Sequence, residues 1–366
     1  MVIRRPTDQI RSLLIICAVL ASSVDAFGEG KGPRAHEGRT LELVVAPDGR
    51  TVVSCGSEGM AKVWETESRR LLRTHRGGEE AINALAMTAD GRWVATGGQV
   101  SRIQVWSPET GEVVAEFPKP GPPESIVASM SFSPDGELLA YGGQQCGVGI
   151  LSVSRKKTVT RLDPACELII RVRFDPAGAR LAATCSDHCV GIICGGKDCR
   201  SKGDHAVGSM FLWEPPYSAP PAHLPGHHGG SYLLDFTRDG SSLVSTGSDK
   251  HIRVWDVEKR SERLAIKVGD DFLGMTLAIS PDGKTIAWVE ETDPRDRDRQ
   301  WDSILLRDVE GEEARSVPTE HHFISFLEFT PDGGKLVVGS YDGTLEIWDA
   351  EEGRLLGAFV DPAVPE

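Results

Sequence analysis

Short runs of aliphatic, aromatic and β-branched residues recur along the chain, and they come in pairs separated by a tight polar turn. Leu41–Ala46 with Thr51–Ser54 is one such pair, and Leu233–Phe236 with Leu243–Ser245 is another. An Asp-Gly dipeptide stands between the two runs of a pair, and glycine accepts the positive φ that closes a hairpin. The pattern therefore predicts a series of antiparallel β-hairpins.

These turns recur with a nearly constant period. Asp-Gly, or Ala-Gly in one case, begins at residues 48, 90, 135, 177, 239, 282 and 332, so the spacings are 42, 45, 42, 62, 43 and 50. A period of about 40–45 residues with four short strands is typical of a propeller blade. We expect an all-β fold, a seven-bladed β-propeller of four-stranded antiparallel blades, with insertions in blades four and six.

A second marker keeps the same register as the turns. Tryptophan recurs after most of them, at Trp64, Trp106, Trp213, Trp255 and Trp348. With these turns and tryptophans, residues 36–360 resemble the tryptophan–aspartate (WD) repeat family. That resemblance implies that a hydrogen-bonded tetrad ties a blade together, and in the fifth repeat the matching residues are His227, Ser245, Asp249 and Trp255.

The other repeats match the tetrad less completely. The first has His36, Ser54 and Trp64 but carries Glu58 where the family has Asp. The second keeps Thr96 and Trp106, and the seventh keeps Asp342 and Trp348. Blades three and six lack the tetrad, so we expect them to be less rigid. Because residues 27–35 have no strand pattern, we also expect the ring to close by packing alone, with Arg354–Val360 as its last outer strand.

The first residues have the layout of a secretory signal. Arg4, Arg5 and Arg11 precede the apolar run Ser12–Val24, and cleavage is expected after Ala26. A membrane-spanning helix needs about 20 apolar residues, which this run does not reach. The expected domains are a signal peptide (1–26), a linker (27–38), the propeller (39–361) and a tail (362–366). We expect a protein exported to the bacterial periplasm, envelope or extracellular space, without membrane insertion after cleavage.

Composition narrows the class of partner. The 366 residues are 40% hydrophobic and carry a net charge of −14, which describes a globular chain and argues against binding to a nucleic-acid backbone. The sequence contains no Cys-x-x-Cys-His, His-Glu-x-x-His or Gly-x-Ser-x-Gly motif. We therefore expect no cofactor and no catalytic residues.

Six of the eight cysteines fall near one rim region of the predicted ring. In an exported chain such a cluster predicts disulfides that pin the insertion of blade four. A metal site built from the thiolates of residues 185–199 with His188 and His205, or unpaired thiols, remain alternatives. The disulfide candidates are Cys146, Cys166, Cys185, Cys189, Cys194 and Cys199.

The insertion of blade six, Glu290–Ser303, offers candidate partner-binding residues. Trp301 is a plausible interface anchor, since tryptophan and arginine are enriched in binding hot spots, although its ring could instead fold back over the rim. The alternation of carboxylates with arginines favours local ion pairing over a calcium loop. The partner-binding candidates are Trp301, Arg297 and Arg299, with His321 and His322 in a link on the same face.

Two functional hypotheses follow. The first is a non-enzymatic scaffold that binds another protein or a peptide on the loop-bearing face of the propeller, where both insertions are expected. The second is a propeller enzyme, or a small-ligand or metal-binding protein, that uses the central cavity. The sequence pattern alone assembles no converging set of carboxylates, histidines or metal ligands at the channel.

Overall fold

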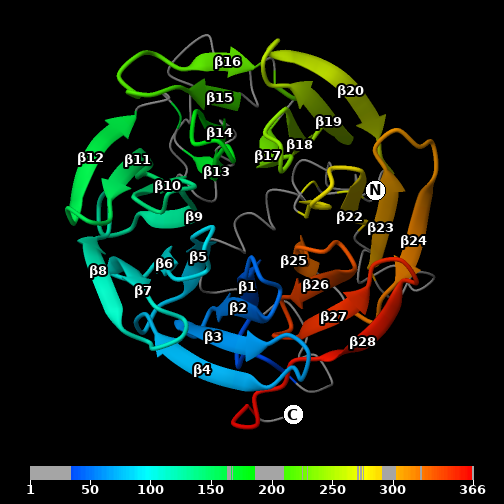
Figure 1. The fold of residues 1–366 in the computed structure, drawn as a ribbon, viewed down its shortest axis with the longest axis horizontal. Coiled ribbons are helices and arrows are strands. Elements are labelled where there is room, and N and C mark those ends of the chain that lie inside the picture. Colours follow the sequence, from blue (N-terminus) through cyan, green and yellow to red (C-terminus); the bar gives the residue numbers. More distant parts are fainter. Residues whose placement is uncertain are drawn as a thin grey trace, which may run out of the picture.

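The computed structural model describes residues 34–364, except 163–165, 167, 186–209, 225, 229, 270–271, 273, 275, 291–301 and 322–323. The described residues contain strands and turns but no helix. Twenty-eight strands form seven four-stranded antiparallel sheets, and each sheet consists of consecutive strands. Figure 1 shows the sheets as blades around a central axis. The predicted all-β, seven-bladed propeller is therefore confirmed.

The first four blades follow the chain from its N-terminal side. Blade one contains β1 (Thr40–Val45), β2 (Thr51–Gly56), β3 (Met60–Glu65) and β4 (Leu71–Arg76). Blade two contains β5 (Ile82–Met87), β6 (Val94–Gly98), β7 (Arg102–Trp106) and β8 (Val113–Pro118). Blade three contains β9 (Ile126–Phe132), β10 (Leu138–Gln144), β11 (Gly147–Ser152) and β12 (Lys157–Leu162). Blade four contains β13 (Ile169–Phe174), β14 (Leu181–Cys185), β15 (Met210–Trp213) and β16 (Ala222–Leu224).

The remaining three blades complete the ring. Blade five contains β17 (Ser231–Phe236), β18 (Ser242–Gly247), β19 (His251–Asp256) and β20 (Ser261–Lys267). Blade six contains β21 (Ala278–Ile279), β22 (Thr285–Glu290), β23 (Ser303–Asp308) and β24 (Ala314–Pro318). Blade seven contains β25 (Ile324–Phe329), β26 (Lys335–Ser340), β27 (Leu345–Asp349) and β28 (Arg354–Ala358).

The Asp-Gly hairpins lie between the first and second strand of each blade. All seven turn glycines have φ between 69° and 73°, a left-handed conformation that favours glycine over any residue with a Cβ. In five blades a Ser or Thr hydroxyl donates to the turn aspartate, as Thr88 does to Asp90 at 2.6 Å. We call this side of the ring the turn face. The opposite side, which carries the links between blades and the connections between second and third strands, is the loop-bearing face.

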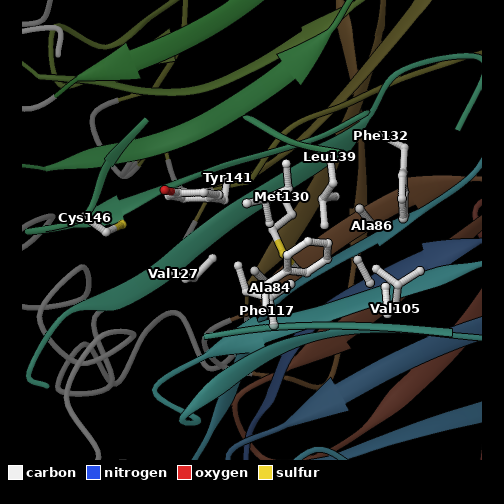
Figure 2. Close-up of a cluster of buried hydrophobic side chains, with 14 residues drawn as sticks. Ala84, Ala86, Val105, Phe117, Val127, Met130, Phe132, Leu139, Tyr141 and Cys146 are labelled. Carbon is white, nitrogen blue, oxygen red and sulfur yellow. The ribbon is translucent and has the colours of Figure 1, made fainter. Parts of the chain in front are cut away.

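The hydrophobic core is divided among the interfaces between neighbouring blades. In the cluster of Figure 2, Phe117 of blade two packs with Met130 and Leu139 of blade three. Further clusters of this kind lie between the other blades. Each blade is therefore stabilised by its neighbours, which explains why a repeat of this kind needs a closed ring.

The ring closes without strand exchange, as predicted, but polar contacts add to the packing that we expected to act alone. β25–β28 form the last blade from one continuous segment, and β28 (Arg354–Ala358) is its outer strand. In Figure 1 this blade lies directly beside blade one. The Ser325 hydroxyl donates to the carbonyl of Thr40 at 2.7 Å. Lys62 of β3 also forms a buried ion pair with Asp361, which follows β28, and Nζ lies 2.6 Å from Oδ2. Packing and polar contacts therefore seal the seam.

Candidate functional site: the loop-bearing face and the axial channel

In blade five the structure brings all four tetrad residues into hydrogen-bonding contact. His227 Nδ1 lies 2.8 Å from Asp249 Oδ1, and its Nε2 lies 2.8 Å from Ser245 Oγ. Trp255 Nε1 donates to Ser245 Oγ at 2.9 Å. Burial lowers the pKa of His227, although its hydrogen bond with Asp249 opposes the shift. A neutral His227 donates from Nδ1 to the carboxylate and accepts the Ser245 proton at Nε2.

Blade one contains the same network with glutamate in place of aspartate. His36 Nδ1 contacts the Glu58 carboxylate, and its Nε2 lies 2.7 Å from Ser54 Oγ. Trp64 Nε1 donates to Ser54 Oγ at 2.9 Å. The longer side chain therefore reaches the histidine from the position where the WD pattern has Asp.

Blade seven contains a third network, which the sequence analysis did not foresee. His321 Nδ1 lies 3.1 Å from Asp342 Oδ2, and its Nε2 lies 3.0 Å from Glu346 Oε1. Trp348 Nε1 donates to the other oxygen of Glu346 at 2.9 Å. The residue at the serine position is Val338, and Glu346 faces it across the strand pair. A third-strand carboxylate thus replaces the second-strand hydroxyl.

This network corrects the expectation for His321. We predicted a partner-binding histidine, but its side chain is only 12% exposed and lies between two carboxylates. Burial lowers its pKa, but the hydrogen bonds that His321 donates to Asp342 and Glu346 outweigh burial and raise the pKa to about 10. His321 is therefore a charged structural residue. In the sequence, the spacing of His321 from Asp342 and Trp348 was the one signal of this role.

The other partner-binding candidates cannot be placed in the same way. Trp301, Arg297, Arg299 and His322 lie outside the described residues. The strands that flank the two insertions are described, however. β14 and β15, like β22 and β23, are second and third strands of their blades. Each of these connections therefore leaves and re-enters the ring on the loop-bearing face.

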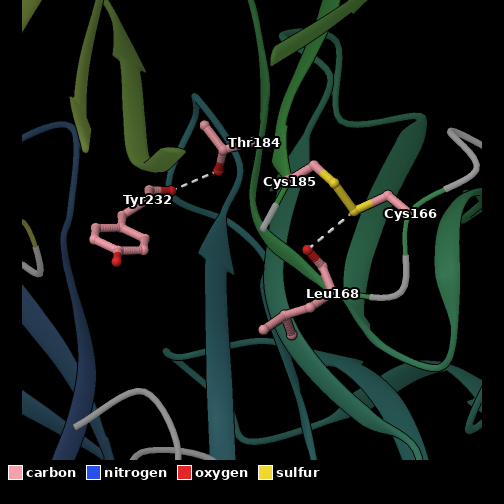
Figure 3. The surroundings of a disulfide bond; sticks show 5 residues. All are labelled: Cys166, Leu168, Thr184, Cys185 and Tyr232. Carbon is pink, nitrogen blue, oxygen red and sulfur yellow. Dashed lines mark hydrogen bonds between the residues drawn. A yellow bond between two sulfur atoms is a disulfide. The ribbon is translucent and has the colours of Figure 1, made fainter. Parts of the chain in front are cut away.

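A disulfide joins two of the six predicted cysteine candidates. Cys166 lies in the link before β13, Cys185 ends β14, and their Cα atoms are 6.3 Å apart (Figure 3). Beside the disulfide, Thr184 Oγ1 donates to the carbonyl of Tyr232 at 2.5 Å and connects blade four to blade five. Because Cys185 is bonded to Cys166, it is not available as a thiolate for the alternative metal site.

Cys146 does not join the disulfide framework that we expected. Its thiol is free and buried between blades two and three, and it is directed at the carbonyl of Ile126. Burial raises its pKa to about 12. The thiol is therefore a packing group with little nucleophilic character. Cys189, Cys194 and Cys199 lie outside the described residues.

A second cluster of polar residues, which the sequence analysis missed, lies in the axial channel. Arg171 and Glu42 form an ion pair of 2.7 Å, and Arg173, Asp235 and Glu328 line a neighbouring cavity. All five come from innermost strands, where a charged residue interrupts an otherwise hydrophobic pattern. That interruption, six or four residues before a turn, is the signal that could have located them.

Comparison with known proteins agrees with the geometry. The model of the WD domain, G-beta repeat, family matches residues 33–65, 67–107, 218–256 and 313–349. These segments contain the first three strands of blades one, two, five and seven. The chain belongs to the WD-repeat family. WD-repeat propellers are typically scaffolds for protein–protein interaction.

A curated relative is known for part of the chain. Protein groucho of Drosophila melanogaster is 24% identical over 217 residues, which cover 59% of this chain and 26% of groucho. The WD-repeat chain therefore matches only about a quarter of that relative's length. Within the described residues, no helix is long and apolar enough to span a membrane.

Proposed function

We propose that this WD-repeat protein is a non-enzymatic scaffold that binds another protein or a peptide on its loop-bearing face. The observation that carries the proposal is the set of three histidine networks in blades one, five and seven. Each joins the segment that precedes the first strand of its blade to the connection between second and third strands. The networks hold the loop-bearing face as a rigid platform, so binding there requires little ordering of the ring.

The strands that flank the two insertions end at this platform. Both connect second and third strands, in blades four and six, and the Cys166–Cys185 disulfide fixes the base of the first. Among the residues of the second, Trp301 has the chemistry of an interface anchor, and Arg297 and Arg299 can pair with carboxylates of the partner. A partner of mixed apolar and acidic surface fits these residues.

We propose also that the scaffold is exported. A disulfide between Cys166 and Cys185 supports this, because such bonds persist in oxidising compartments. Fractionation of the host, with N-terminal sequencing of the protein recovered from the envelope, tests it. The expected N-terminus is Phe27. Recovery of uncleaved protein with reduced cysteines from the cytoplasm would refute export.

The binding proposal is tested by capture from host envelope extract with two variants that carry several substitutions each. The face variant combines Arg76→Glu, Arg102→Glu and Trp301→Ala. Its control combines Arg50→Glu with Lys284→Glu, which lie beside turns on the opposite face. All four basic side chains are substantially exposed, so the substitutions leave the core unchanged.

We expect one protein to be retained by the wild type and the control variant, and lost by the face variant. Thermal unfolding must show that all three forms are equally folded. Loss in both variants, or retention in both, would contradict binding on the loop-bearing face.

A further inference from the structure

The innermost strands place equivalent residues at two levels of the axial channel. Counted from the turns, the first level lies six residues before each turn dipeptide and the second level lies four residues before it. The first level consists of Glu42, Ala84, Ser129, Arg171, Leu233, Thr276 and Phe326. The second consists of Val44, Ala86, Ser131, Arg173, Asp235, Ala278 and Glu328.

An ion pair bridges the first level. Arg171 of blade four reaches Glu42 of blade one at 2.7 Å, and their side chains are 7% and 2% exposed. The second oxygen of Glu42 accepts the Leu85 N–H at 2.6 Å, while the Arg171 guanidinium lies 4.8 Å from the centre of the Phe326 ring. Burial raises the pKa of Glu42, but Arg171 opposes the shift and supplies its counter-charge. Each charge of this buried pair therefore has a partner. We call the Glu42–Arg171 ion pair, which crosses the axial channel, the crossbar.

A cavity of about 280 Å³ lies on the turn-face side of this crossbar. Its walls come from the innermost strands of all seven blades, and its lining begins at the first level. The Asp235 side chain is 46% exposed and that of Arg173 is 21% exposed, in contrast to the sealed crossbar. Solvent therefore reaches the second level, whereas the ion pair of the first level is buried. Its volume is at the lower limit for small-molecule sites.

The second level has one more carboxyl group than it has basic groups. Arg173 Nε lies 3.8 Å from Asp235 Oδ1, and the guanidinium also donates to the carbonyls of Val172 and Met130. Glu328 has no ion pair within the described residues. Burial raises its pKa to about 8, against the opposing effect of a hydrogen bond from the Val45 backbone. At neutral pH the carboxyl group of Glu328 is therefore mostly protonated and uncharged.

We propose that the axial cavity binds one small organic monocation, which carries a primary ammonium or a guanidinium group. Asp235 and Glu328 provide the carboxylates. Apolar walls that include Met87, Met130 and Leu234 accommodate the carbon skeleton. This wall composition suits an organic cation, and the described residues contain no group of three or more potential metal ligands. The site is on the opposite side of the crossbar from the proposed partner-binding face.

The test uses n-butylammonium as the probe in calorimetric titrations of the full chain at pH 6, 7 and 8. Because the cation competes with the Glu328 proton, whose pKa is about 8, its affinity is expected to rise about tenfold from pH 6 to 7 and about fivefold from pH 7 to 8. Binding near pH 7 releases close to one proton, measurable in buffers of different ionisation enthalpy. n-Butanol, which has the same skeleton without charge, is expected not to bind.

Variants locate the site. Glu328→Gln is expected to abolish the pH dependence and weaken binding at pH 8 by at least about tenfold, because it removes one charge–charge interaction. Glu137→Gln is the matched control, since Glu137 is a half-buried carboxylate beside the blade-three turn and outside the axial cavity. If Glu328→Gln fails to fold, Asp235→Asn takes its place, since the Asp235 side chain is 46% exposed. No binding at millimolar probe, pH-independent affinity, or unchanged affinity in the folded cavity variant would overturn the proposal.

Discussion

Blades one and five are held together by a tryptophan on the third strand, whereas blades three and six use an aromatic residue on the second. In blade five the Trp255 ring is hydrogen-bonded to Ser245 and packs toward blade four. In blades three and six the serine position itself is aromatic: Tyr141 packs toward blade two, and Trp288 packs toward blade five. Both arrangements fill the interface between a blade and its predecessor with one large ring.

The difference shows that interface volume is retained where the polar tetrad is lost. Tyr141 fills the space over Gly149, where a Cβ would lie 2.2 Å from the phenol ring. Blades three and six are therefore packed, although we expected them to be less rigid. Blade four differs again, because the Cys166–Cys185 disulfide adds a covalent link where Ala183 stands at the serine position.

Removal of the Trp255 ring or the Tyr141 ring tests this comparison most directly. Trp255→Ala and Tyr141→Ala are each expected to reduce the free energy of unfolding by about 3–5 kcal/mol, because both delete a buried ring and leave a cavity. Denaturant unfolding measures the effect, and Val159→Ala on the exposed edge of β12 is the control, with little change expected. A loss below about 1 kcal/mol for Tyr141→Ala would show that blade three does not depend on its substitute ring.

The contribution of the disulfide in blade four can be measured separately. The double variant Cys166→Ala, Cys185→Ala is expected to lose about 3 kcal/mol, because the crosslink closes a segment with a sequence separation of 19 and restricts the unfolded chain. The matched control is Cys146→Ala, which removes a buried free thiol without breaking a crosslink. Under reducing conditions the wild type should lose the same stability as the double variant. Equal unfolding curves for oxidised and reduced wild type would contradict this role.

The histidines of blades five and seven should respond to pH in opposite directions. His321 has its pKa raised from 6.5 to about 10, so its stabilisation is complete below pH 6.5 and is lost as the pH rises toward 10. The pKa of His227 is lowered, so its stabilisation is lost as the pH falls below 6.5. Stability measured from pH 5 to 10 tests both signs.

Two variants assign these pH effects to their residues. His321→Gln is expected to flatten the alkaline side of the stability profile, and His227→Gln is expected to flatten the acid side. An alkaline decline that persists unchanged in His321→Gln would mean that this histidine is not charged between Asp342 and Glu346.

The smallest expected effect concerns the indole hydrogen bond alone. Trp255→Phe loses ring volume and the hydrogen bond to Ser245. Trp106→Phe loses ring volume and part of the stacking on His75 but no indole hydrogen bond, because the buried Trp106 Nε1 has no hydrogen-bond partner within the described residues. The difference between the two losses should be about 1 kcal/mol. Equal losses by denaturant unfolding would show that the Ser245 hydrogen bond adds no net stability.

The fold was readable from the chain because its determinants are local. Asp48-Gly49 and its six counterparts set each hairpin through the φ of one glycine, and their period fixes the number of blades. The tetrad of blade five could also be named in advance, since its members recur at fixed spacing. The network of blade seven could not, because Glu346 acts in place of a hydroxyl from the neighbouring strand.

The sequence by itself therefore determined the β-hairpins, the seven blades and closure without strand exchange, because turn chemistry and strand alternation act over a few residues. Only the tertiary structure decided that Glu42 meets Arg171, 129 residues later, and that Glu328 faces a cavity beside them. These contacts arise from ring closure, which brings equivalent positions of distant blades to one axis. Burial there changes the pKa of each group, and this depends on neighbours that no local pattern encodes.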